Sequence, residues 1–530
     1  MIQSAAKNVY SNIGLALSGG GYRAAGFHFG LLAYLNHIDL LSQVTMISTV
    51  SGGTFTGAKY ALSLVEGKTF AQFYQEYYGF LKNTKLVELA LGKLGKKESN
   101  IPSGRTDLIT AVAQVYADTF LLNKVDDQPY RFGDILDADI SLKEIIFNST
   151  EFRYGLDFRF QRSAKPKARI GNGSISITKA EAADIRVADI VAASSCFPGG
   201  FEPLAFPEDF NWSSPEILEG VRQRVYQNIS PEIALMDGGI YDNQGIESLY
   251  LADQRSSKDH QLDLFIISDV DQQSKELYDF PAPIKVADLS LHWVDWISKI
   301  AIALCLLTVV SIVLKAAEDI IKGQFIWLDL LLYLVPLLLA TGTAFLLGWI
   351  RNAVQNKILP KIPQAGYFAW DDLKQLTLSQ VANGIYLRVT SLQAMAGSVF
   401  MKRIRRLGYN QIYKDKHREK LVSNLIYELK SGSTLTPLPG VQSPSKKLLK
   451  IIDAAADMPT TLWFTQDNQL NNLIISGQAT ICYSLMVNIT RRNGKDVDAF
   501  PQDAKNLWHK LTTDWGKLCS EPQVLHEERF

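Results

Sequence analysis

The sequence lacks an excess of charge of either sign. Its 530 residues include 54 Lys and Arg against 54 Asp and Glu, so the formal net charge is zero. A strongly basic balance is the usual mark of a protein whose main partner is a nucleic acid. We therefore expect no nucleic acid among the partners of this protein.

Cysteine and histidine are also scarce. The chain has four cysteines without paired spacing, seven histidines, and no H-E-x-x-H pattern. This composition argues against a disulfide framework and a structural zinc site, and it suggests a reducing compartment. The first dozen residues, MIQSAAKNVYSN, lack the apolar stretch of a signal peptide. We expect no metal, no cofactor and no signal peptide.

One region is far more apolar than the rest of the chain. Residues 300–314 (IAIALCLLTVVSIVL) and 330–350 (LLLYLVPLLLATGTAFLLGWI) carry no charge. As a helix, the second run would span about 31 Å, enough to cross a bilayer core of roughly 30 Å. The alternative is a pair of buried core helices. We predict a transmembrane helical hairpin over 291–355, with helices at about 296–314 and 328–350.

Two crossings place both flanks of this hairpin on one side of the membrane. Basic residues near the membrane are enriched on the cytoplasmic side, and the flanks hold a small excess of them over the connecting loop. We therefore expect a multi-pass membrane protein whose soluble parts face the cytoplasm. The flanking residues are Lys299, Arg351, Lys357 and Lys361, and those of the loop are Lys315 and Lys322.

Residues 1–290 have the pattern of an α/β domain. Apolar runs of strand length stand at 13–17, 44–50, 233–236 and 262–268, and helical patterns follow the first two. A strand–helix–strand–helix order favours a parallel sheet covered on both faces.

Residues 356–530 are mainly helical, and we expect them to form a separate module packed on the core. Within them, residues 401–420 hold eight basic and two acidic side chains. This basic patch is interpreted either as a solvated helix face or as a surface that lies on anionic lipid.

Three consecutive glycines, Gly19, Gly20 and Gly21, stand between the first strand and the first helix. Backbone N–H groups at a helix start favour negative charge, so this turn is suited to a phosphate or to the oxyanion of an acyl transfer. A P-loop would end in Lys-[Ser/Thr], and a dinucleotide site would have spaced glycines. The chain has neither, which weakens the phosphate interpretation.

Ser51 stands where the second apolar strand turns into a helix, in MISTVSGG. A serine on a tight strand-to-helix turn is the arrangement of a nucleophile elbow, and Gly52 and Gly53 allow close backbone contact. The general form G-x-S-x-G has glycine two residues before the serine, where this chain has Thr49. A β-branched side chain there could crowd the elbow. The alternative role of Ser51 is a simple helix N-cap.

Asp237 follows another apolar strand, in LMDGGIYDNQG. A carboxylate at the carboxyl end of a strand lies on the same rim of a parallel sheet as the other strand-end loops. Asp237 is therefore a candidate base for Ser51, with Gly238 and Gly239 beside it. The alternative is an ordinary Asp-Gly turn.

Taken together, these segments resemble the signature blocks of the patatin-like phospholipases. The blocks are SGGGYRAAGFHFG, STVSGG and DGGIYDNQG, in that order, and AASSCFPGGFEP (192–203) resembles the segment that precedes the aspartate in that family. The resemblance covers roughly residues 10–275. It implies a three-layer α/β/α sandwich with a mainly parallel central sheet.

The resemblance also implies roles for individual residues. Ser51 would be the nucleophile and Asp237 its base, in a Ser–Asp dyad without histidine. Backbone N–H groups around Gly19–Gly21 would form the oxyanion hole, and Arg23 would brace that turn through backbone carbonyls or a carboxylate. His28 is then expected to be a packed helix residue.

The leading hypothesis is a membrane-anchored serine lipid acyl hydrolase. It would cleave phospholipids or lysophospholipids through an acyl-serine intermediate. The alternative is a catalytically silent protein of the same fold that binds lipid or a protein partner at the membrane, with Thr49 as the reason for inactivity. A nucleotide-binding protein is the weakest candidate.

Overall fold

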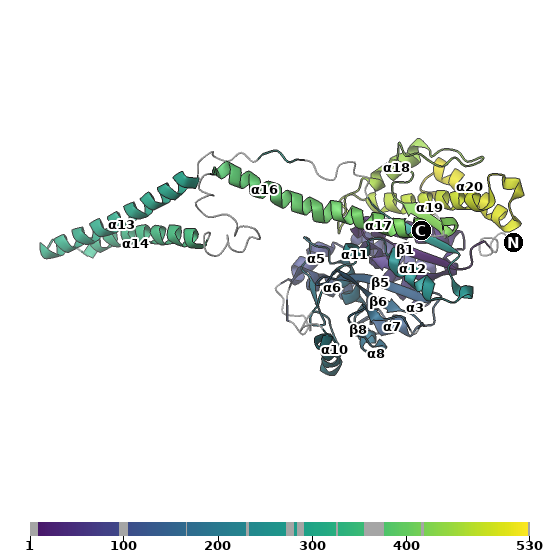
Figure 1. Cartoon of the computed structure of the whole chain (residues 1–530), viewed down its shortest axis with the longest axis horizontal. Coiled ribbons are helices and arrows are strands. Elements are labelled where there is room, and N and C mark those ends of the chain that lie inside the picture. Colours follow the sequence, from purple (N-terminus) through teal and green to yellow (C-terminus); the bar gives the residue numbers. More distant parts are fainter. Residues whose placement is uncertain are drawn as a thin grey trace. The chain divides into compact units, whose positions relative to one another are not determined.

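The computed structural model describes residues 9–94, 104–105, 107–165, 167–228, 233–271, 280–283, 291–324, 327–353, 376–414 and 418–527 (Figure 1). The chain divides into two compact units. The first comprises Met1–Lys275 with Phe400–Phe530, and the second comprises Glu276–Val399.

The centre of the first unit is a sheet whose middle strands run parallel. Their order is β12-β11-β1-β2-β5, and each neighbouring pair is parallel. A parallel pair needs a long crossover, which the helix between β1 and β2 provides. Side chains of β1 are buried along its whole length, as expected for a strand covered on both faces. The bounds are β1 Ile13–Leu17, β2 Val44–Val50, β5 Glu144–Glu151, β11 Leu264–Asp269 and β12 Leu421–Leu425.

Antiparallel strands extend the sheet beyond β5. Strands β6, β7 and β8 follow one another at this edge. Strands β9 and β10 are also antiparallel, and β10 pairs with the last residues of β5. The bounds are β6 Leu156–Arg162, β7 Ile170–Gly171, β8 Ser176–Ile177, β9 Leu204–Phe206 and β10 Ile233–Asp237.

The direction of β10 corrects one step of the sequence argument. Asp237 was expected at the carboxyl end of a parallel strand, but β10 runs antiparallel to β5. Strand β2 pairs with the first part of β5 and β10 with its last part, so that Val50 lies opposite Asn148 and Asp237 opposite Ser149. Strands β2 and β10 therefore end at adjacent positions of β5, which brings Asp237 to the turn after β2.

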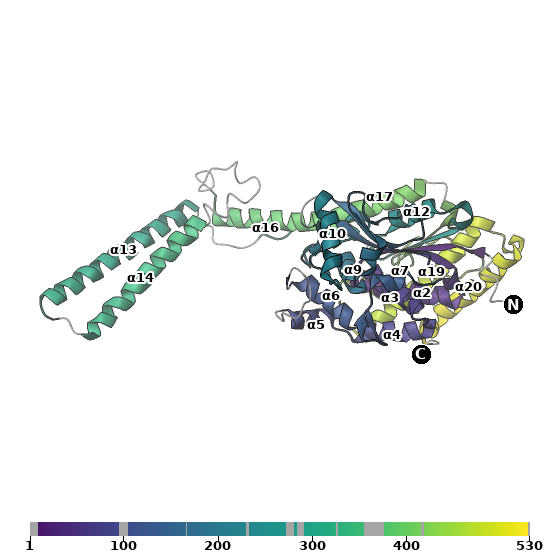
Figure 2. The ribbon, with the colours of Figure 1, turned by 90° about the horizontal axis from the view of Figure 1, so that it is seen from below.

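Helices cover both faces of the sheet, as Figure 2 shows. Leu15 and Leu17 of β1 pack into the cluster that includes residues of α2 (Gly21–His37), α3 (Gly52–Val65) and α9 (Val187–Ser195). Ala16, between them, packs with residues of α12 (Ile246–Arg255) on the opposite face. This alternation follows the period of two in a strand. The predicted three-layer α/β/α sandwich is confirmed.

Other elements of residues 66–242 surround this core. They are α4 Phe70–Asn83, α5 Leu86–Lys93, α6 Leu108–Asp118, β3 Leu122–Asn123, β4 Gln128–Pro129, α7 Phe132–Leu136, α8 Lys179–Ala183, α10 Pro215–Asn228 and α11 Gly239–Asp242.

The expectation of a separate C-terminal module is wrong. Strand β12 joins the sheet beside β11, and residues 400–530 belong to the same compact unit as the N-terminal part. Helix α19 packs closely on α2: a Cβ on Gly30 would lie 2.1 Å from the Ile474 carbonyl oxygen, and one on Gly477 would lie 2.2 Å from that of Phe27. The helices of this region are α17 Met401–Lys414, α18 Lys446–Ala456, α19 Gln469–Asn493, α20 Gln502–Ser520 and α21 Val524–Glu527.

The second unit contains the predicted helical hairpin. Helices α13 (Leu291–Ile321) and α14 (Trp327–Ala353) lie side by side in both views (Figures 1 and 2). The unit also contains α16 (Leu378–Ala394), after which a π-helix, η7 (Met395–Phe400), crosses the boundary between the units. Helix α13 continues beyond Leu314 to Ile321, so most of the predicted polar loop is helical. Lys357 and Lys361 lie outside the described residues.

Two helices among the described residues are long and apolar enough to cross a membrane. In the first, Lys299–Ile321 of α13, none of the most apolar segment is buried, whereas 89% of the corresponding segment of α19 is buried. Helix α19 is therefore a core helix. Within the described part of α14, a shorter apolar stretch covers Leu334–Leu346 and includes Pro336.

Candidate active site

Ser51 stands alone between β2 and α3 in a strained backbone conformation. Its φ is 51° and its ψ is −119°, a combination that few residues other than glycine adopt. Its backbone N–H donates to Ser194 Oγ at 3.1 Å, and its side chain makes no capping bond to α3. The N-cap alternative is therefore not supported, and the geometry is that of a nucleophile elbow.

The two glycines after Ser51 bring the elbow into direct contact with neighbouring backbone. A Cβ on Gly52 would lie 2.2 Å from the carbonyl oxygen of Gly21, and one on Gly53 would lie 2.4 Å from that of Leu17. Neither obstacle is a flexible side chain. The glycine turn after β1 and the serine turn after β2 therefore pack backbone against backbone.

Thr49 fits the elbow without crowding it. Its Oγ1 lies 3.0 Å from Thr54 Oγ1 in a buried hydrogen bond. Its methyl group, Cγ2, occupies the space that a side chain on Gly57 of α3 would fill, 2.5 Å from the position of such a Cβ. The absence of a side chain at position 57 thus offsets the extra bulk at position 49.

Ser194 holds the elbow from the side of α9. Its Oγ donates to the Asn148 carbonyl at 2.7 Å, so the hydroxyl proton is engaged there. Ser194 Oγ therefore accepts the N–H of Ser51 and the hydroxyl of Thr54, the latter at 2.8 Å. Neither Ser194 nor Thr54 was predicted from the sequence to have a role in the site. The only sequence feature that pointed to Ser194 was its place in the small-residue segment AASSC.

Asp237 lies beside Ser51, and the Ser51 hydroxyl acts to lower the pKa of its carboxyl group. It is only 6% exposed, its Oδ1 accepts the N–H of Gly239 at 2.7 Å, and its own N–H donates to the Cys196 carbonyl at 2.9 Å. Burial raises its pKa to about 6, although the Ser51 hydroxyl and the Gly239 N–H act in the opposite direction. A carboxylate with this pKa is ionised at neutral pH and is a stronger base than an exposed one.

The backbone around Asp237 needs its two glycines as well. A Cβ on Gly238 would lie 2.4 Å from the Asn148 carbonyl oxygen, and one on Gly239 would lie 2.9 Å from Oδ1 of Asp237. Both glycines therefore allow the end of β10 to approach β5 and the carboxylate closely.

The structure narrows the set of candidate oxyanion donors. The N–H of Gly19 donates to the backbone carbonyl of Asn243 at 2.9 Å and is therefore engaged. The N–H groups of Gly20 and Gly21 have no acceptor within the described part of the chain. Their φ values, +147° and +58°, suit glycine alone among common residues. Gly20 and Gly21, at the start of α2, are the available donors.

Arg23 anchors this turn to the C-terminal region. The buried guanidinium donates through Nη1 to the Met458 carbonyl at 2.8 Å. The turn also contacts Thr461 in the C-terminal region. Tyr22 N–H donates to the Thr461 carbonyl at 2.8 Å, and a Cβ on Gly21 would lie 2.4 Å from the same oxygen. Burial and the nearby Arg405 lower the pKa of Arg23 to about 10, while Asp271 and Asp269 act to raise it.

His28 is a packed residue beneath the turn. Its Nε2 lies 3.0 Å from the Ser18 carbonyl, which can only accept, so Nε2 carries the proton. Its Nδ1 lies 2.8 Å from Ser268 Oγ. Burial lowers its pKa to about 4, so it is neutral at physiological pH.

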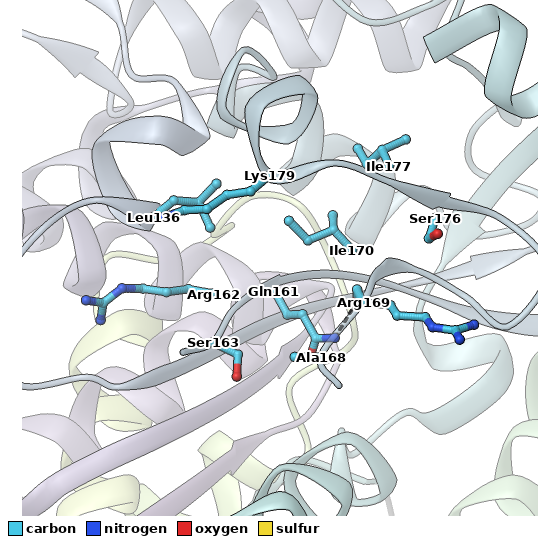
Figure 3. A pocket seen from close by; sticks show the side chains of 10 residues that line it. All are labelled: Leu136, Gln161, Arg162, Ser163, Ala168, Arg169, Ile170, Ser176, Ile177 and Lys179. Carbon is cyan, nitrogen blue, oxygen red and sulfur yellow. Dashed lines mark hydrogen bonds between the residues drawn. The ribbon is translucent and has the colours of Figure 1, made fainter. Parts of the chain in front are cut away.

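A cavity of about 200 Å³ lies elsewhere in the same unit (Figure 3). Its lining includes Arg162 and Arg169, whose guanidinium groups point away from each other, and Lys179. Arg162, which lines the cavity, lies opposite Ile145 near the start of β5. Val50, the residue before Ser51, lies opposite Asn148 further along that strand. The cavity is therefore not part of the Ser51 site. Among the described residues, no three His, Cys, Asp or Glu side chains are grouped to hold a metal.

The strained serine turn, the facing glycine turn and the buried carboxylate define a patatin type of α/β protein. Residues 15–250 match the family model described as patatin-like phospholipase. These residues therefore form a patatin-like phospholipase domain.

Two solved structures are similar to this chain at low identity. Human GIVD cytosolic phospholipase A2 shares 14% identity over 50% of this chain and 45% of its own, with a TM-score of 0.28. VipD from Legionella pneumophila shares 12% identity over 95% of this chain and 92% of its own, with a TM-score of 0.25. The chain thus spans less than half of the human protein. No curated protein matches the sequence.

Proposed function

We propose that this protein is a serine hydrolase that cleaves fatty-acyl esters of phospholipids or lysophospholipids. The observation that carries the proposal is the strained turn at Ser51, which stands beside the buried Asp237 and the N–H groups of Gly20 and Gly21. The family match of residues 15–250 supports lipid esters as the substrate class.

The reaction begins with transfer of the Ser51 hydroxyl proton to Asp237 as Oγ attacks the ester carbonyl. The oxyanion that forms accepts hydrogen bonds from Gly20 and Gly21, whose direction the backbone already fixes. Asp237 then returns the proton to the leaving alcohol, which leaves the acyl group on Ser51. Water, deprotonated by the same carboxylate, then attacks the acyl-serine. The bond to Ser51 Oγ breaks, Asp237 passes the proton to Oγ, and the fatty acid leaves.

The apolar second unit supports attachment of this hydrolase to a membrane. The exposed apolar segment of α13, 23 residues long, would span about 35 Å as a helix. With α14 it would form a two-span anchor, with the soluble unit in the cytoplasm. Anchoring would keep the catalytic unit beside the bilayer in which its substrate is concentrated.

The catalytically silent alternative loses its main argument, because Gly57 accommodates Thr49. The test is fatty-acid release from mixed phospholipid and lysophospholipid vesicles by the full chain purified in detergent. We expect release by the wild type and by Ser42→Ala, a variant of an exposed serine, and none by Ser51→Ala. A fluorophosphonate probe should label the wild type but not Ser51→Ala. Absence of both release and labelling in the wild type would establish the silent alternative.

A further inference from the structure

Arg405 departs from the rest of the basic stretch 401–420. On α17, Arg403 and Arg406 are exposed, whereas the side chain of Arg405 is only 12% exposed. Tyr409 is one turn further along the same face, and it donates to Asp269 Oδ2 at 3.3 Å. This face of the helix therefore packs against the loop after β11, and Arg405 is not available to a lipid surface.

Arg405 is held by two carboxylates and one amide. It forms an ion pair with Asp271 through Nη1 and another with Asp269, whose Oδ1 lies 3.8 Å from Nη2. When the Asn243 amide is oriented to satisfy its neighbours, its oxygen accepts from Arg405 Nε at 2.8 Å and also from Nη2. The guanidinium thus uses its planar fork to hold Asn243, which an ammonium group could not do in the same way.

Asn243 in turn touches both halves of the candidate site. Its backbone carbonyl accepts the N–H of Gly19 at 2.9 Å. Its amide group lies 2.5 Å from the position of a Cβ on Gly19 and 2.4 Å from that of a Cβ on Gly239. Gly239 donates its own N–H to Oδ1 of Asp237.

We propose that Arg405 is a positioning residue for the reaction and that it acts through Asn243. By fixing Asn243, it holds the Gly19–Gly21 turn and the Asp237 loop in register with Ser51. Arg405 contacts neither Ser51 nor Asp237 and is not a catalytic residue. This inference rests on the proposed hydrolase function.

The test compares Arg405→Lys, Asn243→Ala and the double variant with the wild type, using a soluble ester substrate. Lysine keeps the positive charge beside the buried Asp269 and the half-buried Asp271, so neither carboxylate loses its nearby cation. Misplaced catalytic geometry lowers turnover with little effect on substrate affinity. We expect kcat to fall about 10- to 100-fold in each single variant with KM changed less than about threefold.

Both single changes break the same contact. The kcat of the double variant should therefore be no lower than that of the less active single variant. Arg406→Gln, on the exposed side of the same helix, is the matched control and should keep wild-type kcat. The fraction of protein labelled at saturating fluorophosphonate gives the concentration of active enzyme, by which each kcat is corrected. Melting temperatures show whether a variant is folded.

Independent, multiplying losses in the double variant would overturn the proposal, as would unchanged kcat in Arg405→Lys. A loss accounted for by the fraction misfolded would also overturn it. An inactive wild type would instead refute the proposed function, so the two failures are distinguishable.

Discussion

Thr49 and Gly57 share one space behind the nucleophile turn: the methyl group of Thr49 lies 2.5 Å from where a Cβ on Gly57 would stand. The residue that departs from G-x-S-x-G is matched by a glycine eight positions later, on the first turns of α3. The turn keeps its shape because the larger side chain at position 49 faces a residue without a side chain at position 57.

Introducing a side chain at position 57 should therefore destabilise the protein. Overpacking of a filled core site lowers stability by about 1–3 kcal/mol, and we expect Gly57→Ala to fall in this range. Thr49→Ala removes the methyl, so the double variant should be more stable than the sum of the single effects predicts. Thermal denaturation of the four proteins measures this coupling. Additive effects would contradict the shared-space interpretation.

Activity should depend on the ionisation of Asp237. Its pKa of about 6 means that the base is protonated in acid, so kcat/KM should fall about tenfold per pH unit below pH 6. A rate profile on a soluble ester, between pH 4 and 9, checks the midpoint. A profile without a limb near pH 6 would exclude Asp237 as the base.

The raised pKa of Asp237 should also make the stability of the folded protein depend on pH. A folded-state pKa above the ordinary aspartate value means that the folded protein favours the protonated form, so this contribution to stability is lost as pH rises through about 6. Asp237→Asn cannot ionise and should melt at a higher temperature than the wild type at pH 8. The difference should shrink toward pH 4, while the variant stays inactive at every pH. An unchanged difference across this range would contradict the burial-driven shift.

Ser194 should matter to turnover more than its neighbour. Ser194→Ala removes the acceptor for the Ser51 N–H and a hydrogen bond to Asn148, so we expect kcat to fall about 10- to 100-fold. Ser195→Ala is the matched control, because Ser195 Oγ donates within its own helix, to the Val191 carbonyl at 2.7 Å. Equal losses in both variants would assign the effect to α9 as a whole rather than to the elbow.

The hairpin should behave as an integral membrane segment. We expect the full chain to remain in the membrane fraction after alkaline carbonate extraction. If the soluble unit faces the cytoplasm, the short connection at 322–324 lies on the far side of the bilayer. Protease added to the cytoplasmic face of sealed vesicles should then leave this connection intact. Cleavage there from the cytoplasmic face would refute the orientation.

Local pattern was sufficient for the first two strands and the α-helices that follow them. The strands at 13–17 and 44–50 and the helices after them are where apolar runs and the glycine turns indicate them. Ser51 and Asp237 could likewise be named as candidates, because each stands at the end of an apolar run and directly before paired glycines.

The remainder depends on contacts between distant residues. The sequence of β10 does not encode its direction, which is set by pairing with β5. The short strand LVSNL could not be assigned to the sheet, nor helix α19 to the core, because their burial depends on β11 and α2. The role of Arg405 could not be predicted, because in the sequence it stands among other basic residues. Only its contacts with Asp269, Asp271 and Asn243 distinguish it from the exposed Arg406.

Strands β11 and β12 are parallel neighbours, yet β11 ends at Asp269 and β12 begins at Leu421. The whole second unit is therefore an insertion within a single crossover, for which a connection of about a dozen residues suffices. Lengthening such a connection is thermodynamically cheap, at about 0.6 kcal/mol for each doubling. Strand order and the Ser51 turn do not depend on what the insertion contains. A change at this one connection could therefore add, exchange or remove the second unit without altering the sheet, so the proposed membrane attachment and the proposed chemistry can be tested separately.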